Sequence, residues 1–166
     1  MHRILYLSLI FVVFTFSCKE KNQEIAENNE HYESMDLMDK GIPLKINAPE
    51  GTKVKVDVEN FYKDITLNDD NGYNIQIIAT EAFTDSLYSI KQELISEVEK
   101  NPFFNKMISD EANGFIFEKK TNDSTYNYDF RYVKIQDGQQ FVFQAGLYGL
   151  FTKDQVLKMY DSVKGK

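Results

Sequence analysis

Cysteine and histidine are scarce in this sequence. Cys18 is the only cysteine, and the two histidines are His2 and His31. Residues 41–166 therefore contain neither type. That region cannot form a disulfide bond, a Ser-His-Asp or Cys-His catalytic unit, or a zinc site with the usual nitrogen and sulfur ligands. We expect a domain that is stabilised by its apolar core alone.

The sequence also lacks the glycine-rich motifs of nucleotide-binding proteins. Neither G-x-x-x-x-G-K-[ST] nor G-x-G-x-x-G occurs. Basic residues are outnumbered, with 19 Lys and Arg against 26 Asp and Glu and a formal net charge of −7. An acidic chain is not attracted to nucleic acid and is repelled by anionic lipid. We therefore expect no cofactor and no nucleic-acid partner.

One run of turn-forming residues, Asn-Asp-Asp-Asn-Gly at 68–72, has some of the residue types of a calcium loop. An EF-hand loop with Gly72 at its sixth position would place Leu67 first and Ile78 twelfth. Both positions require oxygen ligands in that motif. The sequence therefore predicts a polar hairpin connection here and no metal site.

Long apolar runs are missing except at the N-terminus. Residues 4–16 are apolar apart from Ser8 and Thr15, and they follow the basic start His2-Arg3. A transmembrane helix needs about 20 apolar residues. This shorter run is typical of the hydrophobic region of a secretory signal peptide.

The end of that run, Ser17-Cys18 followed by polar residues, resembles the lipobox of bacterial lipoproteins. The resemblance implies that residues 1–17 are a signal peptide and that Cys18 carries the lipid, palmitate among its acyl chains. Two or more acyl chains hold a protein stably in a membrane. Lys19, where family members retained at the inner membrane often have Asp, implies the outer membrane. An uncleaved anchor and an ordinary signal peptide with an incidental cysteine remain alternatives.

Composition divides the rest of the chain into two parts. Residues 18–40 are rich in Glu, Asn and Lys and poor in large apolar residues, which predicts a flexible polar tether. Residues 41–166 have the length and apolar content of a single domain. We expect an exported protein, anchored in the bacterial cell envelope through its lipidated N-terminus, on the periplasmic face or at the cell surface.

Hydrophobic periodicity predicts an α+β domain in the order β-β-β-α-β-β-β-β-α. Apolar residues alternate with polar ones in the predicted strands, and they recur every three or four residues in two predicted helices. Such elements pack as an antiparallel sheet of about six to seven strands with two main helices. The predicted strands are 54–58, 64–67, 73–79, 103–110, 114–120, 126–135 and 139–145, and the predicted helices are 85–100 and 152–163.

This element order resembles the PsbP-like α/β sandwich. The entry Ala-Pro-Glu-Gly at 48–51, the central helix, the strands between 115 and 143 and the closing helix from Thr152 carry the resemblance. It spans about residues 41–163. The resemblance implies an exported or lumenal protein that binds or assists other proteins, with binding favoured over chemistry.

The longest predicted strand contains a candidate binding surface. Tyr126, Tyr128 and Tyr132 share one face of it with a phenylalanine, and Arg131 lies on the other face. The tyrosine face is either a platform for a ligand or partner or a face that packs under helices. We expect Arg131 to form a cross-strand ion pair, with an acidic ligand group as the alternative.

Carboxylates at three nearby positions are candidate acid–base groups. These are Glu118, Asp123 and Asp129, which two neighbouring predicted strands and their turn bring together. Paired carboxylates act as acid and base only when their surroundings separate their pKa values. No such partner is evident, so we expect a solvated face.

The sequence favours a non-catalytic binding or accessory module, and no catalytic residue is assigned. Two alternatives remain open: a structural or assembly subunit of an envelope complex, and a carboxylate-dependent hydrolase acting on glycan. An exposed apolar patch would favour binding. A pocket with two carboxylates about 5–10 Å apart would favour the hydrolase. A sheet face wholly covered by the helices, with no cleft, would favour the assembly role.

Replacement of Cys18 by Ala is expected to abolish lipidation, because this residue supplies the only thiol in the chain. Cells expressing the parent or the variant are labelled with radioactive fatty acid, and incorporation is normalised to protein amount by immunoblotting. Equal labelling of the two proteins would contradict the lipoprotein interpretation.

Overall fold

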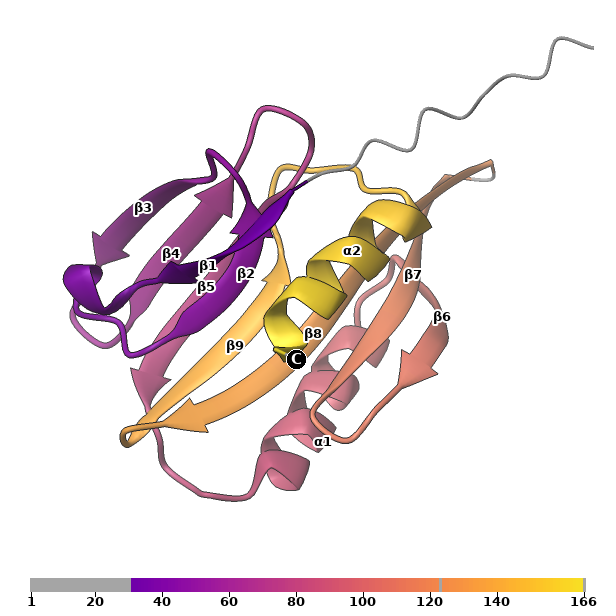
Figure 1. Cartoon of the computed structure of the whole chain (residues 1–166). Coiled ribbons are helices and arrows are strands. Elements are labelled where there is room, and N and C mark those ends of the chain that lie inside the picture. Colours follow the sequence, from indigo (N-terminus) through magenta and orange to yellow (C-terminus); the bar gives the residue numbers. More distant parts are fainter. Residues whose placement is uncertain (1–30, 123, 166) are drawn as a thin grey trace, which may run out of the picture.

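The computed structural model describes residues 31–122 and 124–165, so Cys18 and the expected signal peptide lie outside the described residues. The described chain forms strands, two α-helices and a short 3-10 helix η1 (Met38–Lys40) (Figure 1). The helices are α1 (Leu87–Glu99) and α2 (Lys153–Lys164). The strands are β1 (Tyr32–Asp36), β2 (Lys45–Pro49), β3 (Lys53–Val58), β4 (Lys63–Asn68), β5 (Asn74–Glu81), β6 (Phe104–Asp110), β7 (Gly114–Asn122), β8 (Thr125–Gln136) and β9 (Gln139–Ala145).

Seven of the strands form one antiparallel sheet in the order β3-β4-β5-β9-β8-β7-β6. Strands β3 to β5 pair in chain order before α1, and β6 to β9 pair in chain order after it. These two meanders meet at the centre of the sheet, where β5 pairs with β9. The remaining strands, β1 and β2, pair with each other in a separate two-stranded sheet.

Local sequence explains the tight turns of the sheet. Asp137 and Gly138 join β8 to β9 with φ angles of 51° and 73°. Two consecutive positive φ values are typical of a type I′ hairpin turn, which aspartate and glycine favour. At the other predicted hairpin, Asp69 Oδ1 accepts hydrogen bonds from the backbone N–H groups of Asn71 and Tyr73. The predicted hairpin between β4 and β5 is confirmed.

Both helices begin at side-chain caps. The Ser86 hydroxyl accepts from the backbone N–H of Ser89 at the start of α1. Thr152 and Gln155 form a capping box at the start of α2, in which each side chain binds the other residue's backbone N–H. The buried face of α2 includes Val156, Met159, Tyr160 and Val163.

The two faces of the sheet are covered unequally. Ile116 of β7 packs with α2 and with β1 and β2 in the larger core, whereas its neighbours Phe115 and Phe117 pack with Val98 of α1 in a smaller one. Alternate residues of a strand point to opposite faces. Hence α2 and the β1–β2 pair cover one face (Figure 1), and α1 covers part of the other.

The predicted fold class is confirmed at the level of an α+β protein with two helices and a seven-stranded antiparallel sheet. The predicted order of strands and helices matches β3 to α2. Within residues 31–122 and 124–165, no helix has the length and apolar content that a membrane span requires.

The structure differs from the prediction at the end of the expected tether. Tyr32–Asp36 pairs with Lys45–Pro49, and Leu37 is only 1% exposed within the larger core. Composition alone did not reveal this strand because its exposed side chains are polar. The folded region therefore begins before Lys40, and the β1–β2 pair is an addition to the predicted architecture.

Substitution of Leu37 by Ala is expected to lower the free energy of unfolding by about 2–5 kcal/mol, because it leaves a cavity in the core. The neighbouring Met38, which is 60% exposed, is the matched control, and Met38→Ala is expected to change stability by less than about 0.5 kcal/mol. Urea denaturation followed by circular dichroism measures both effects. Equal stability of the two variants would contradict the placement of Leu37 in the core.

Candidate functional site

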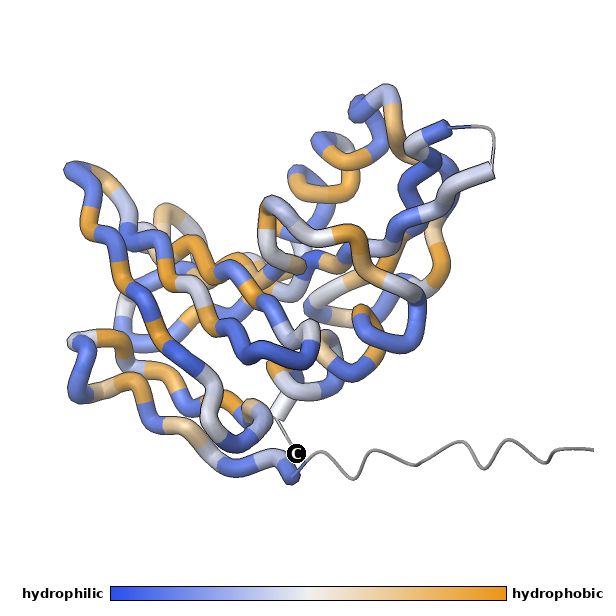
Figure 2. The backbone as a smooth tube through the Cα atoms, turned by 90° about the horizontal axis from the view of Figure 1, so that it is seen from above, coloured by the Kyte–Doolittle hydropathy of each residue, from blue (hydrophilic) through white to orange (hydrophobic). Residues whose placement is uncertain are grey.

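A groove lies on the sheet face that α1 leaves uncovered. Figure 2 shows α1 over one half of the sheet and the strands β3 to β5 extending away from it. The groove has a volume of about 730 Å³. It extends along β4, β5 and β9, from the β3–β4 turn and the β5–α1 loop to the β9–α2 loop. Its lining residues are Asn60, Phe61, Tyr62, Asp64, Gln76, Ile78, Thr80, Glu81, Phe83, Gln144 and Leu147.

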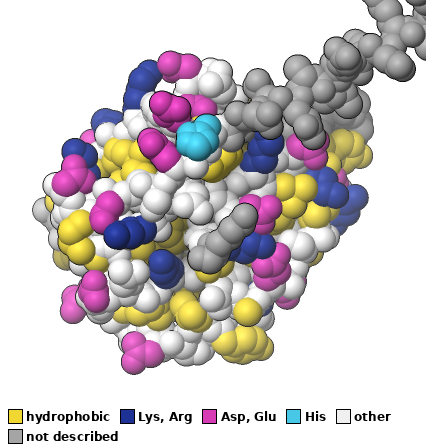
Figure 3. All heavy atoms as spheres, viewed as in Figure 1, with side chains coloured by type: hydrophobic (Ala, Val, Ile, Leu, Met, Phe, Trp, Pro, Cys, Tyr) yellow, Lys and Arg dark blue, Asp and Glu magenta, His cyan; other side chains and the backbone are white. Residues whose placement is uncertain are grey.

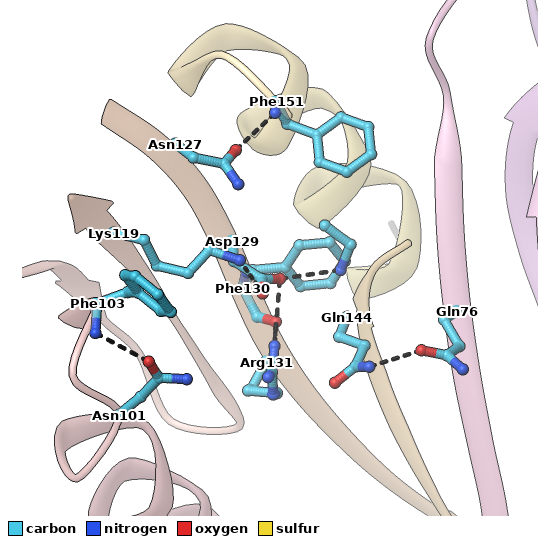
Figure 4. Close-up of polar contacts among 11 residues, drawn as sticks. Gln76, Asn101, Phe103, Lys119, Asn127, Asp129, Phe130, Arg131, Gln144 and Phe151 are labelled. Carbon is cyan, nitrogen blue, oxygen red and sulfur yellow. Dashed lines mark hydrogen bonds and ion pairs between the residues drawn. The ribbon is translucent and has the colours of Figure 1, made fainter. Parts of the chain in front are cut away.

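Three polar side chains form a hydrogen-bonded ladder across the floor of the groove. Gln144 Nε2 donates to Gln76 Oε1 at 2.7 Å, and Gln76 Nε2 donates to Asp64 Oδ2 at 2.7 Å. Gln76 and Gln144 are directly opposite each other on β5 and β9. Figure 4 shows their two amides pointing toward each other. The ladder fixes the orientation of both amides.

The ladder ends at an unsatisfied acceptor. Asp64 Oδ1 is buried and has no hydrogen-bond partner among the described residues. A buried polar atom left in this state costs about 1–3 kcal/mol relative to one that is hydrogen-bonded. The carboxylate to which this atom belongs lines the groove and is a candidate contact for a ligand that donates a hydrogen bond.

Exposed aromatic rings stand at one end of the groove. Phe61 in the β3–β4 turn is 89% exposed and Phe83 in the β5–α1 loop is 91% exposed. Tyr62 lies beside Phe61 and is 42% exposed, and Leu147 at the far end is 66% exposed. Apolar side chains this exposed in connecting loops contribute little to the stability of the fold. Their presence therefore needs another explanation.

A second cavity of about 210 Å³ adjoins the groove under the C-terminal end of α1, and the two share Gln144 and Leu147. Asp129 is its central carboxylate. Its Oδ2 pairs with Lys119 Nζ at 3.0 Å and its Oδ1 with Arg131 Nη1 at 3.1 Å. Oδ1 also accepts from the backbone N–H groups of Phe130 and Ala145 (Figure 4). This network satisfies the carboxylate within the protein.

The expectation of a solvated carboxylate face is wrong for Asp129 and Glu118, which are 6% and 5% exposed. Neighbouring cations and hydrogen-bond donors stabilise both buried carboxylates, because a buried charge is tolerated when it is paired and hydrogen-bonded. Asp123 lies outside the described residues. The expected partner of Arg131 is also corrected: it pairs with Asp129 of its own strand, and its guanidinium lies 5.4 Å from the centre of the Phe117 ring.

Glu118 forms a separate polar cluster on the other face of the sheet. Tyr128 Oη donates to Glu118 Oε2 at 2.7 Å, and Asn105 Nδ2 donates to Oε1 at 2.5 Å. The Tyr128 hydrogen bond lowers the pKa of the Glu118 carboxyl below its ordinary value of 4.5. The same hydrogen bond raises the pKa of the Tyr128 hydroxyl.

The four residues of the predicted binding surface do not form one surface. Tyr128 and Tyr132 pack against the larger core on the face that α2 covers, and Tyr132 makes edge-on contacts with Phe143 and Tyr160. Tyr126, near the start of β8, is 48% exposed. Arg131 lies on the opposite face, as expected, in the second cavity.

The groove residues escaped sequence reasoning. The sequence pattern that could have grouped part of this lining is the two-residue periodicity of β5, which places Gln76, Ile78 and Thr80 on one face. The position of Gln144 beside Gln76 follows from a pairing between strands 68 positions apart in the chain. No local pattern encodes that neighbour.

The groove offers carboxylates, amides and aromatic rings. Asp64 and Glu81 are its acidic residues. In the part of the chain that the structure describes, no group of three His, Cys, Asp or Glu side chains is close enough to hold a metal ion. Such a lining suits hydrogen bonding and stacking with an organic ligand.

Comparison with known proteins assigns no family to the chain: no family model matches it, and no curated protein matches it either.

The Glu118 cluster predicts a pH-dependent contribution to stability. Because the folded-state pKa is lowered, the ionised carboxylate stabilises the fold above pH 4.5, and this contribution is lost as pH falls through the folded-state pKa. The variant Glu118→Gln is expected to be less stable than the parent at pH 7, with the difference shrinking below pH 4.5. Urea denaturation at pH 7 and pH 3 measures it.

The exposed Glu93 of α1 provides the control, as Glu93→Gln makes the same chemical change without these hydrogen bonds. If parent and Glu118→Gln differ by the same free energy at both pH values, the linkage is absent.

Proposed function

We propose that this protein is an exported, lipid-anchored binding module whose groove receives a ligand or partner at the cell envelope. The observation that carries the proposal is the groove with exposed aromatic rings over a preformed polar ladder. Ligand sites generally combine apolar surface with a few fixed polar groups.

The exposure of Phe61 and Phe83 supports a role in binding. Both side chains are about nine-tenths exposed and line the same cavity. Burial of a side chain of this size stabilises a complex by about 1.5–3 kcal/mol. Large apolar side chains that gather beside one groove are typical of an interaction site.

The opposite face of the sheet provides a contrast. Side chains of both charge signs are interspersed over the face that carries β1, β2 and α2 (Figure 3). Mixed charge of this kind keeps a protein surface soluble and does not select a partner. The uncovered face is therefore the better candidate for recognition.

Two alternatives remain, a hydrolase and an assembly subunit. A hydrolase requires the two carboxylates of the groove, Asp64 and Glu81, to lie about 5–10 Å apart, and turnover of a glycan by the purified protein would support it. An assembly subunit is expected to have a sheet face wholly covered by helices with no cleft, whereas the face opposite the β1–β2 pair carries a groove.

Membrane attachment and family remain part of the proposal. Ser17-Cys18 supports lipidation at Cys18, and Lys19 supports the outer membrane. The strand and helix order from β3 to α2 supports the resemblance to the PsbP-like sandwich. That family's accessory role agrees with a binding module without chemistry.

A photoactivatable benzophenone amino acid at position 83 tests the groove in the full chain in its envelope. Illumination is expected to produce an adduct at position 83, detected as a mass shift, because this side chain stands over the cavity. The partly exposed Tyr126 is the matched control, since it is an aromatic residue of the surface predicted from sequence.

The cross-linked partner is then purified and titrated against parent and against a variant that combines Phe61→Ser with Phe83→Ser. We expect at least tenfold weaker binding by the variant. Adducts at position 126 alone, or at both positions equally, would contradict the assignment of function to the groove.

A further inference from the structure

We propose that the groove binds an extended peptide segment that carries a lysine or arginine side chain flanked by apolar residues. This inference rests on the proposed binding function and specifies its ligand. Three features of the groove carry it: the charge of its lining, the unsatisfied oxygen of Asp64 and the aromatic end.

The lining of the groove is acidic. Asp64 and Glu81 contribute carboxylates, and no lysine, arginine or histidine is present among the described residues that line it. Neighbouring cations are engaged by other groups: Lys55 of β3 interacts electrostatically with Asp64 but donates to Asp57, Lys63 Nζ donates to the Gly41 carbonyl, and Arg131 pairs with Asp129. A cleft lined by one sign of charge attracts ligands of the opposite sign. Anionic ligands such as phosphates and carboxylates would meet acceptors without a compensating cation.

The ladder identifies the carboxylate that a ligand cation would meet, that of Asp64, which lines the groove. Gln76 Oε1 already accepts from Gln144 and Gln76 Nε2 already donates to Asp64, so the amide cannot turn to serve Asp64 Oδ1. That oxygen is buried and lacks a partner within the described chain. An ammonium or guanidinium group donates charge-assisted hydrogen bonds to carboxylates, which are stronger than neutral ones.

The aromatic end suits the same ligand. Phe61, Tyr62 and Phe83 stand at the end of the groove that also contains Glu81. Cations are attracted to aromatic faces, and the methylene stem of lysine or arginine packs on apolar surface. Ile78 continues the apolar surface along the floor between the rings and the ladder.

The length of the groove favours a peptide over a small amine. Along β5 it extends from Gln76 to Glu81, about 17 Å at ~3.4 Å per residue, which an extended segment of about five residues matches. β5 is paired on both sides, with β4 and with β9, so its backbone groups are satisfied. The peptide is therefore held by side chains and not by addition of a strand.

The test is titration of the full-chain protein in detergent micelles with a pentapeptide labelled at its N-terminus, dansyl-Ala-Leu-Lys-Leu-Ala-amide, read by fluorescence anisotropy. We expect binding that weakens at least tenfold when norleucine or glutamate replaces the lysine. The variant Asp64→Asn is expected to bind the lysine peptide at least tenfold more weakly than the parent.

Asp161→Asn is the matched control, because it makes the same charge change on α2, on the other side of the sheet, at a carboxylate that is 68% exposed. Unchanged binding is expected there. Glu81→Gln, at an exposed position of the rim, provides a second groove variant should Asp64→Asn unfold, which thermal melting by circular dichroism reveals.

Equal affinity for the lysine and norleucine peptides would overturn the cation inference and leave the binding function in place. Binding of chitotriose or maltotriose in preference to every peptide would also overturn the cation inference and leave the binding function in place. Persistence of the adduct at position 83 without binding of any peptide would overturn the peptide ligand. Loss of that adduct itself would instead contradict the proposed function.

Discussion

The antiparallel pairing of β5 with β9 joins the two halves of the main sheet. One half, β3 to β5, precedes α1 in the chain, and the other, β6 to β9, follows it. Ile77 is opposite Phe143 in this pairing, and both side chains are at most 1% exposed in the larger core. One residue earlier on β5, Gln76 faces Gln144 on the opposite side of the sheet. The core and the polar ladder of the groove therefore depend on a single register.

The uncovered half of the sheet follows from the dimensions of its elements. Seven strands spaced about 4.8 Å apart span roughly 29 Å, whereas a helix with its side chains is about 10–12 Å wide. On one face, α2 and the β1–β2 pair share this width. On the other face α1 is the helix that packs, over β7 and β8, and the strands beyond it line the groove.

The sequence predicted what short-range patterns encode. Alternating residues located the seven strands of the main sheet, and the predicted helix from Thr152 matches the start of α2. It did not predict β1, whose polar side chains resemble a linker, nor the burial of Asp129, whose donors come from β7, β8 and β9. The groove was missed for the same reason, because its floor joins strands from the two meanders. Long-range pairing is decided by the packing of the whole chain.

The position of β1 has a consequence for how far the domain extends from a membrane. Because β1 begins at Tyr32, an anchor at Cys18 would be connected to the folded region by residues 19–31. At ~3.5 Å per residue such a connection reaches at most about 45 Å, whereas a tether up to Lys40 would reach about 75 Å. A short connection raises the effective concentration of the groove toward partners in the same membrane and restricts it toward distant ones.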